Sequence, residues 1–413
     1  MEAFPPELII EIMRYLPFRD LIRCHRVSRS WRTILASEPS LYRQVDLRAV
    51  CQPLSSLHIN ALARYAAGNI RDLRLSSVMQ TFTEAISLQI EAGTPGFKSH
   101  RGIVLKPLFE NLQVFEHRND VIQHRCLWFG LAFFPPRTLQ KLHLCQMLDL
   151  SQVERLLQEA PTLECLHCWI YQRTTMDIGE PRYPNLKTLS VVVQSSREVG
   201  GFQLDRFLAR FPEVEEFQMD EASIDIRHSI DLNFLLPKLK ILRIFNRVSM
   251  IQVGSKYLHT IEIQTATQLR TLSLSSDASF VEVTLNDLRH PDLLEQFRRH
   301  ASALQKLSLQ SAFLEVRDVS PFLLNGGSLR YISLSQVRYV NDSTLEMLSH
   351  CKFLERLDID HCPGATGSGI IKLVERLSVK IGGKLSIVSA RGNESLRRQT
   401  LDWASRMGVK ILI

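Results

Sequence analysis

Apolar residues recur along most of the chain in a six-residue pattern, apolar-x-x-apolar-x-apolar. Copies begin at Ile70, Leu139, Leu163, Leu186, Val214, Leu239, Leu258, Leu269, Leu304, Leu329 and Leu354. Positions four and six of each copy point to one side of an extended chain, so each copy predicts a short strand with one buried face. The starts at Leu139 and Leu163 lie 24 residues apart, and those at Leu304 and Leu329 lie 25 apart. This period is typical of architectures that add one strand per repeat.

Helix-like apolar spacing fills several of the gaps between these strands, over residues 153–160, 204–211, 345–348 and 370–377. Pro161, Pro184, Pro212 and Pro237 each stand two residues before a strand anchor, where proline ends the preceding element and favours extended geometry. Strand, turn, helix and proline make one coil, and the coils must stack because none can bury its own apolar face. The pattern predicts an α/β solenoid: a curved parallel sheet with outer helices.

The register of the repeat is irregular in two places. Leu258 and Leu269 begin copies only 11 residues apart, and residues 280–285 fit a further strand before Leu304. Between Ile70 and Leu139 there is one weak copy, Leu112/Phe115, and a loop near residues 93–106. We expect an irregular section at about residues 80–137 and a terminal cap at about 384–413, the latter with a helix at 396–407 and a final strand at 409–413.

The first fifty residues predict three short amphipathic helices instead. Leu8, Ile12 and Leu16 form one apolar stripe at helical spacing. Pro5 and Pro6 suit its first turn, and Pro17 ends it. A second stripe, divided at the favourable N-cap Ser28, consists of Leu21, Cys24, Val27, Trp31, Ile34 and Leu35. Helices this short bury little surface alone. By pattern they form either a cap for the next domain or a module whose apolar face is completed by a partner.

The residues of this segment closely resemble an F-box. The family pattern runs L-P-x-E-[IL]-[IL], then L-x-x-x-D-L, then V-[SC]-[KR]-x-W-[KR]. This chain has Phe4-Pro5-Pro6-Glu7-Leu8-Ile9, Leu16-Pro17-Phe18-Arg19-Asp20-Leu21, and Val27-Ser28 followed by Trp31-Arg32. Phe4 replaces the usual leucine, and Met13 stands where leucine or phenylalanine is common; both are apolar and of similar bulk. Leu357 to Cys362, with Cys351 upstream, resembles the cysteine-containing leucine-rich repeats common in F-box proteins.

The resemblance implies a domain division and a set of partners. It implies an F-box at residues 1–47 and a leucine-rich-repeat solenoid at residues 48–413. F-boxes dock onto a Skp-type adaptor, which links them to a cullin scaffold. By resemblance, the adaptor-binding residues are Phe4, Pro5, Leu8, Ile9, Leu16 and Leu21, and the F-box core comprises Ile12, Cys24, Val27 and Trp31.

Few residues have spacing that suggests chemistry. Cys165, His167 and Cys168 have metal-like spacing, but Cys168 is at inward position six while the other two face outward, so we expect no zinc site. Gly382-Gly383-Lys384 lacks the remainder of a phosphate loop and is interpreted as a turn. We assign no catalytic residue, metal or cofactor.

The outward strand positions instead predict a protein-binding surface. Positions three, five and seven should line the concave side of the solenoid. The candidate target-binding residues there or beside it are Trp169, Tyr171, Phe245, Tyr331, Arg356 and Asp358. Aromatic and arginine side chains dominate the binding energy of protein interfaces, which is why this set is favoured. The alternative is that Trp169 and Phe245 pack into irregular coils.

Composition and charge limit the possible partners and the cellular compartment. The formal charge of +7 over 413 residues is mild, and the acidic cluster Glu215, Glu216, Asp220 and Glu221 interrupts any continuous basic face that nucleic acid would need. The sequence shows no secretory signal and no apolar run of about 20 residues for a membrane helix. Eight irregularly spaced cysteines then indicate reduced thiols, in the cytoplasm or nucleus.

The function implied by the resemblance is that of a substrate-recognition subunit of a Skp–cullin–F-box ubiquitin ligase. Its solenoid would bind an unknown target protein for ubiquitination and degradation, and the subunit itself would catalyse nothing. The alternative is a Skp-binding scaffold that acts outside ubiquitination. An enzyme hidden in the irregular insertions is disfavoured because the sequence shows no convergent acid, base or metal ligands.

Overall fold

The computed structural model describes residues 4–46, 66, 69–76, 111–118, 137–172, 182–195, 204–221, 229–245, 250–264, 266, 269–275, 277–298, 302–311, 316–325, 327–337, 339–377, 385–393 and 398–413. The chain divides into two compact units, Met1–Phe202 and Gln203–Ile413, called unit 1 and unit 2 below. The loop predicted near residues 93–106 and the turn at Gly382-Gly383-Lys384 lie outside the described residues.

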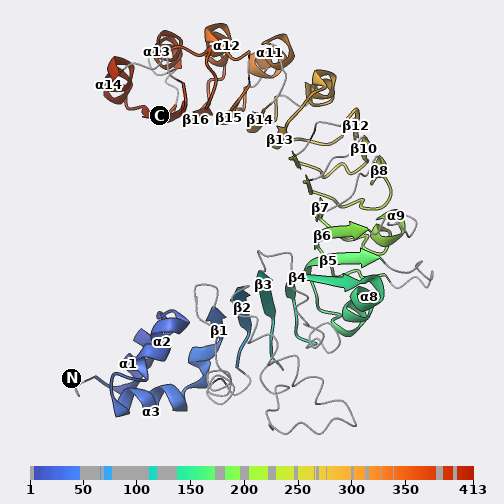
Figure 1. The fold of residues 1–413 in the computed structure, drawn as a ribbon, viewed down its shortest axis with the longest axis vertical. Coiled ribbons are helices and arrows are strands. Elements are labelled where there is room, and N and C mark those ends of the chain that lie inside the picture. Colours follow the sequence, from blue (N-terminus) through green and yellow to red (C-terminus); the bar gives the residue numbers. More distant parts are fainter. Residues whose placement is uncertain are drawn as a thin grey trace. The chain divides into compact units, whose positions relative to one another are not determined.

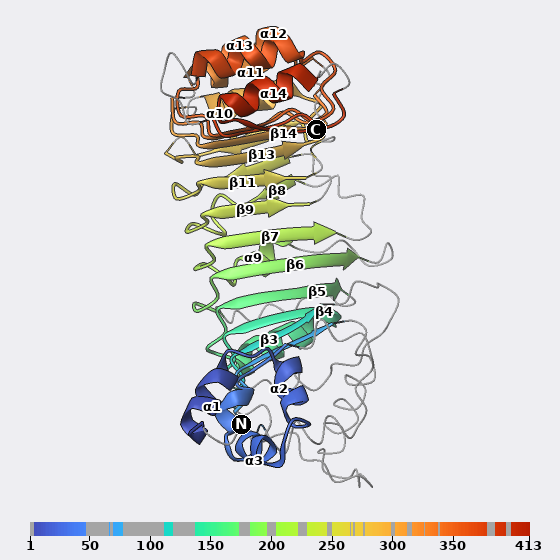
Figure 2. The same cartoon turned by 90° about the vertical axis from the view of Figure 1, so that its left-hand side faces the viewer.

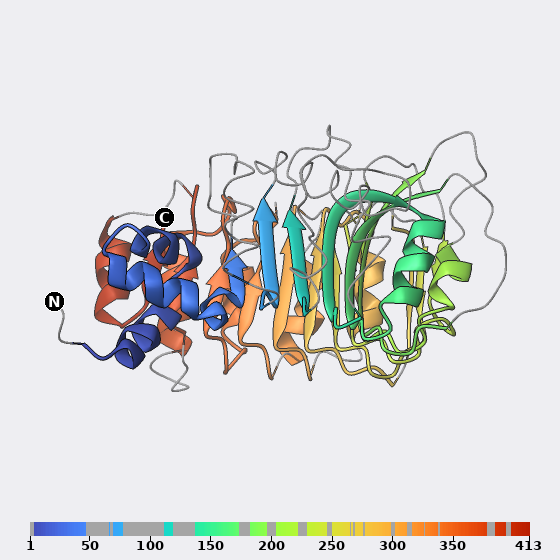
Figure 3. The same ribbon diagram turned by 90° about the horizontal axis from the view of Figure 1, so that it is seen from below.

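Unit 1 begins with short helices and continues into a parallel sheet. The helical segment comprises α1 (Pro6–Arg14), α2 (Phe18–Cys24), α3 (Arg29–Ser37) and the 3-10 turn η1 (Pro39–Tyr42). The sheet adds β1 (Gln44–Asp46), β2 (Asp72–Ser76), β3 (Val114–Arg118), β4 (Lys141–Asp149), β5 (Cys165–Gln172) and β6 (Thr188–Ser195), each parallel to the next. Helix α8 (Leu150–Glu159) packs against β4 and β5 (Figure 3). The predicted N-terminal helices and the weak strand copy at Leu112/Phe115 are therefore confirmed.

The sheet of unit 1 begins before the predicted F-box boundary. Strand β1 pairs with β2 in parallel register, and α2 contacts β1. The helical segment is thus continuous with the first strand of the sheet. The boundary after residue 47 stays a prediction.

Unit 2 repeats the coil in a longer parallel sheet (Figure 2). In order across the sheet its strands are β7 (Glu216–Glu221), β9 (Ile241–Ile244), β11 (Thr260–Ile263), β13 (Glu282–Asn286), β14 (Lys306–Gln310), β15 (Tyr331–Ser333), β16 (Arg356–Asp358), β17 (Ile387–Ser389) and β18 (Lys410–Leu412). Its helical elements are α9 (Leu204–Leu208), η4 (Pro291–Leu294), α10 (Glu295–Arg298), α11 (Val316–Asn325), α12 (Asp342–Leu348), α13 (Gly367–Glu375) and α14 (Arg398–Arg406). Helices α11–α14 lie on one side of strands β14–β16 (Figure 1). The opposite face of the unit 2 sheet, on which no helix lies among the described residues, is called its helix-free face below.

Three coils of unit 2 carry a short strand on the helical side of the main sheet (Figure 1). Strands β8 (Ser229–Asp231), β10 (Met250–Val253) and β12 (Thr271–Leu274) form a second parallel sheet, in the order β12-β10-β8. The copy predicted at Leu269 therefore does not belong to the main sheet, and this explains its short spacing from Leu258. The strand predicted at residues 280–285 is confirmed as β13, which pairs with β11.

The alternation predicted for each strand builds the core. In β14, Leu307 and Leu309 have no exposed surface, whereas Lys306 and Gln310 on the opposite face are partly or fully exposed. Burying one leucine contributes about 1.5–3 kcal/mol. Repeating this pair in every coil accounts for the excess of buried leucine, isoleucine and valine. The fold predicted from the sequence, helices followed by a leucine-rich-repeat sheet with outer helices, is confirmed.

Candidate protein-binding surfaces

Local sequence sets the ends of the N-terminal helices. Pro5 and Pro6 stand at the start of α1, where no amide donor is needed. Ser28 caps α3, its side-chain oxygen accepting a hydrogen bond from the Trp31 amide at 3.1 Å. Ser28 was predicted as this cap from the sequence.

The core of the helical segment is built from a different side of α1 than the sequence predicted. The inward stripe of α1 consists of Ile9, Met13 and Leu16, of which Met13 is fully buried. The other buried side chains are Leu21, Cys24, Ile34, Leu35, Leu41 and Tyr42. Tyr42 packs edge-on against Phe18 and lies 2.9 Å from the His25 ring nitrogen through its hydroxyl.

The outer side of α1 leaves a run of large apolar side chains exposed. Phe4, Leu8, Ile12 and Tyr15 are 60%, 50%, 56% and 81% exposed. Leu8 and Ile12 share one side of α1, whereas Phe4 precedes the helix and Tyr15 is its C-cap. We call these four residues the α1 apolar surface. Pro5 is also exposed, and Ile9 and Leu16 are half-buried.

Three residues of the predicted F-box set are corrected. Ile12 and Val27, predicted in the core, are 56% and 60% exposed. The apolar stripe of α1 is broad enough that the helix rotates Met13 inward and Ile12 outward. Leu21, predicted as an adaptor contact, is only 2% exposed and belongs to the core. Cys24 is buried and Trp31 half-buried.

The face of the unit 1 sheet opposite helix α8 carries a row of polar residues among the described residues. Parallel register aligns Asp46, Arg74, Glu116, His143, His167 and Ser190 across β1 to β6. The rings of His143 and His167 stack at 3.8 Å, and His167 Nδ1 lies 2.6 Å from the Ser190 hydroxyl. The candidate Trp169 is half-buried on β5, whereas the Tyr171 side chain lies outside the described residues.

The three residues with metal-like spacing in β5 lie on the faces of the strand that the register predicted. Cys168 is completely buried, which raises the pKa of its thiol to about 12, and Cys165 and His167 are on the other face. No group of three or more His, Cys, Asp or Glu side chains within the described ranges is placed to hold a metal ion.

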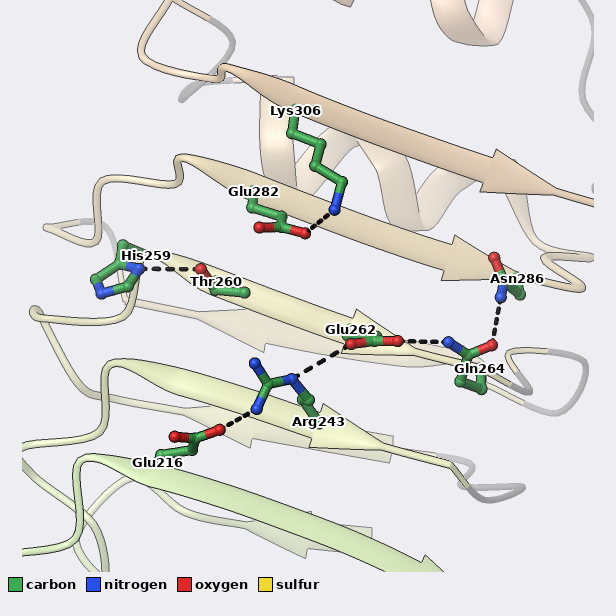
Figure 4. A network of polar contacts seen from close by, with 9 residues as sticks. All are labelled: Glu216, Arg243, His259, Thr260, Glu262, Gln264, Glu282, Asn286 and Lys306. Carbon is green, nitrogen blue, oxygen red and sulfur yellow. Dashed lines mark hydrogen bonds and ion pairs between the residues drawn. The ribbon is translucent and has the colours of Figure 1, made fainter. Parts of the chain in front are cut away.

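The helix-free face of the unit 2 sheet carries a longer polar network (Figure 4). Arg243 on β9 pairs with Glu216 on β7 and, through Nε at 3.4 Å, with Glu262 on β11. Gln264 donates to Glu262, and Asn286 donates to Gln264. Lys306 on β14 pairs with Glu282 on β13. Phe245 is half-buried directly after β9.

Three of the predicted target-binding residues form one cluster further along this face. The Tyr331 hydroxyl donates to Asp358 at 2.6 Å, and Arg356 binds both oxygens of Asp358 at 3.0 and 3.1 Å. The charged groups of Lys306 and Arg356 lie 5.5 and 5.3 Å from the centre of the Tyr331 ring. Burial and the hydrogen bond to Asp358 raise the pKa of Tyr331 to about 12. The same carboxylate raises the pKa of the Arg356 guanidinium by accepting its hydrogen bonds.

The sequence did not single out Glu262, Gln264, Glu282, Asn286 and Lys306. All five occupy the outward strand positions that flagged Tyr331 and Arg356. The signal was therefore present, but the register of residues 258–304, which include four of the five, was not settled from the sequence.

Comparison with known proteins defines the class. Residues 1–48 match the family model described as F-box-like. The F-box/LRR-repeat protein 12 of Homo sapiens and that of Bos taurus are each 34% identical over 85 residues, 20% of this chain and 25% of theirs. The match thus spans a quarter of the length of these curated relatives. The chain therefore begins with an F-box-like domain, and the coils that follow have the leucine-rich-repeat fold that the sequence predicted.

Two solved structures also resemble the chain at low identity. An internalin from Listeria monocytogenes str. 4b F2365 matches 81% of this chain over 93% of its own, with 13% identity and a TM-score of 0.40. A chain from the yeast Rad7–Elc1 complex matches 100% of this chain over 98% of its own, with 14% identity and a TM-score of 0.38. In the part of the chain that the structure describes, no helix is both long and apolar enough to cross a membrane.

Proposed function

We propose that this protein is the substrate-recognition subunit of a Skp–cullin–F-box ubiquitin ligase, acting in the cytoplasm or nucleus. The observation that carries the proposal is the F-box-like match over residues 1–48 together with the α1 apolar surface. Four large apolar side chains exposed on a nine-residue helix and at its two ends are costly to leave in water. A Skp-type adaptor that covers them would recover that free energy.

The repeat domain holds the target in this proposal. The sheet faces opposite its helices present polar, charged and aromatic side chains in fixed register, which suits recognition of another protein. The subunit contributes proximity and no chemistry: it raises the effective concentration of a target lysine beside the ubiquitin-charged enzyme, which the cullin scaffold brings.

The adaptor contact is tested by co-purifying the full chain with a Skp-type adaptor and a cullin. A double variant, Leu8→Asp with Ile12→Asp, places two charges on the α1 apolar surface. Because both side chains are half-exposed in the free chain, the fold should persist. Adaptor affinity should fall at least about 30-fold, since two buried aliphatic contacts contribute about 2 kcal/mol or more.

The matched control is Phe353→Asp, which charges an exposed apolar residue of unit 2 (55% exposed), outside the residues that match the F-box-like model. It should leave adaptor capture unchanged. Wild-type chain that fails to capture the adaptor would refute the proposal. Adaptor capture without cullin-dependent turnover of any bound partner would favour the scaffold alternative.

A further inference from the structure

The helix-free face of unit 2 is divided into an acidic and a basic section. On β7, β9, β11 and β13 the outward-facing charged residues are four acidic ones and a single basic one, Arg243. The acidic residues are Glu216, Asp220, Glu262 and Glu282. The outward-facing charged residues on or directly after β14 to β18 are Lys306, Arg356, Arg391 and Lys410 against Asp358 and Asp360. We call these the acidic section and the basic section. The acidic section stands out because the whole chain carries a net charge of +7.

Pairing within the face does not remove this division. Arg243 is shared by Glu216 and Glu262, so one cation serves two carboxylates. Arg356 is held by Asp358, while Arg391 and Lys410 are exposed and make no ion pair with any residue that the structure describes. Among the described residues, the ion pair that joins the two sections is that of Lys306 with Glu282, at their boundary.

A chain of side-chain amides in the acidic section ends on an acceptor without a partner. A carboxylate can only accept hydrogen bonds, so Glu262 obliges Gln264 to present its NH₂ group. The Gln264 oxygen then accepts from the Asn286 NH₂ group, which leaves Asn286 Oδ1 as the free end. This atom is buried, and among the described residues it has no hydrogen-bond partner.

The direction of these side-chain hydrogen bonds determines which kind of group Asn286 Oδ1 lacks. Amide orientation is normally ambiguous, but here it is set by Glu262, which Arg243 holds in place. The missing group at Asn286 is therefore a donor, such as an N–H of a lysine, an arginine or a peptide backbone. A buried acceptor without a donor is unfavourable, so a partner that shifts the covering side chains and supplies one gains affinity.

We propose that the helix-free face of unit 2 binds an extended, charge-segregated segment of the target, with basic residues over the acidic section and acidic residues over the basic section. This deepens the proposed function, since the occupant is the protein to be ubiquitinated. Strands lie about 4.8 Å apart, so the nine strands span about 38 Å. At about 3.3 Å per residue, a segment of about 12 residues covers that distance.

Synthetic 12-residue peptides test the proposal with the full chain. Two carry a lysine block and a glutamate block in opposite orders, a third alternates lysine and glutamate, and two more contain only one charge. Fluorescence anisotropy should show at least one block peptide binding about 10-fold more tightly than the alternating peptide of equal composition, and more weakly as salt rises. Equal affinity for block and alternating peptides, or tightest binding of a single-charge peptide, would overturn it.

Variants of the face locate the contact. Glu262→Gln removes a charge and allows the amide chain to reverse, and Lys410→Glu reverses a charge in the basic section. Each should weaken the block peptide about 5-fold or more. The matched controls Glu295→Gln on α10 and Lys372→Glu on α13 change exposed charges on helices and should have no effect. Controls that weaken binding as much as the face variants would contradict the assignment.

Variants of Asn286 distinguish a specific hydrogen bond to this side chain from general electrostatic attraction to the face. Asn286→Gln keeps a side-chain amide, both donor and acceptor, at this position and should retain more affinity than Asn286→Leu, which removes both; thermal melting checks that both fold. Equal effects of the two substitutions would refute the acceptor role. Failure of peptide binding with intact adaptor capture would refute this inference alone, and peptide binding without adaptor capture would refute the ligase proposal alone.

Discussion

Four non-glycine residues in the left-handed region mark the same point in successive coils of unit 2. Asp287, Ser311, Gln336 and His361 have φ between 49° and 60°, and each follows a strand of the main sheet. Their amides donate to Gln310, Ser335, Asp360 and Arg391 of the following coil at 2.7–3.1 Å. The conformation costs about 1 kcal/mol or more per residue, and these inter-coil hydrogen bonds offset it by extending the ladder beyond the strands.

Gly392 occupies the corresponding position of the next coil, and replacing it should destabilise the fold. Its φ is +68°, and an added Cβ would lie 2.2 Å from His361 Nδ1. We expect Gly392→Ala to destabilise the chain by about 2 kcal/mol, measured by urea unfolding. Gly327→Ala is the matched control, because a Cβ there meets nothing within 4 Å. A Gly392→Ala variant as stable as the control would show that His361 can move away freely.

The burial of Cys168 predicts how stability and thiol reactivity depend on pH. Its thiol is completely buried, and its pKa is raised from 9.0 to about 12. The unfolded thiol ionises first as pH rises, so its contribution to stability is full below pH 9 and is lost as pH approaches 12. In the folded chain at pH 8.5, iodoacetamide should label the half-buried Cys165 and spare Cys168, as followed by mass spectrometry. Labelling of both at equal rates would contradict the burial of Cys168.

At the scale of elements, helices in adjoining coils are joined by side-chain caps. Asn341 caps α12 in a capping box with Thr344. Asp342, the first residue of α12, accepts hydrogen bonds from the Thr366 amide at 2.8 Å and hydroxyl at 2.7 Å, at the start of α13. Gly369 permits this approach, because a Cβ there would lie 2.2 Å from Asp342 Oδ1.

Removing this link should loosen the last coils. We expect Asp342→Ala to lower the free energy of unfolding by about 1–2 kcal/mol, because it leaves the amide and hydroxyl of Thr366, the N-cap of α13, without their acceptor. Guanidinium unfolding followed by circular dichroism measures the change. Glu375→Ala, at an exposed position of the same helix, is the control and should change stability by less than about 0.5 kcal/mol.

Some elements could be predicted from neighbouring residues alone, and others could not. The alternation of β14 and the apolar spacing of α8 and α13 predicted their types and inward faces, because these periods depend on neighbouring residues alone. The second sheet of β8, β10 and β12 escaped prediction. Four-residue apolar strands such as β12 have the same pattern whether they lie in the main sheet or on the helical side.

At the scale of the whole molecule, the chain joins an F-box-like domain to stacked coils in which each strand pairs only with its neighbours. In such an architecture stability is close to a sum of nearest-neighbour terms, and the terminal coil shields the one before it. We propose this role for strand β18 and helix α14 in unit 2, because β18 pairs with β17 and α14 contacts α13.

Deleting residues 398–413 tests this role. It exposes the edge of β17 and one side of α13, so the melting temperature should fall by about 5 °C or more. Hydrogen exchange should accelerate first in β17 and α13 and hardly at all in β9 and β11. Arg406→Ala, which leaves both elements in place, is the control. Acceleration spread evenly across unit 2 would indicate all-or-none unfolding instead.

The sequence by itself determined the repeat period, the inward residue of almost every strand and the Ser28 cap, since each follows from spacing along the chain. Only tertiary structure decided which side of α1 is buried: a stripe wide enough to face either way is oriented by packing against α3 and η1, which places Met13 inside and Ile12 outside. Tertiary structure also decided the polar contacts. Glu262, Gln264 and Asn286 lie on two strands brought together by stacking, and the direction of their hydrogen bonds follows from the carboxylate that anchors them.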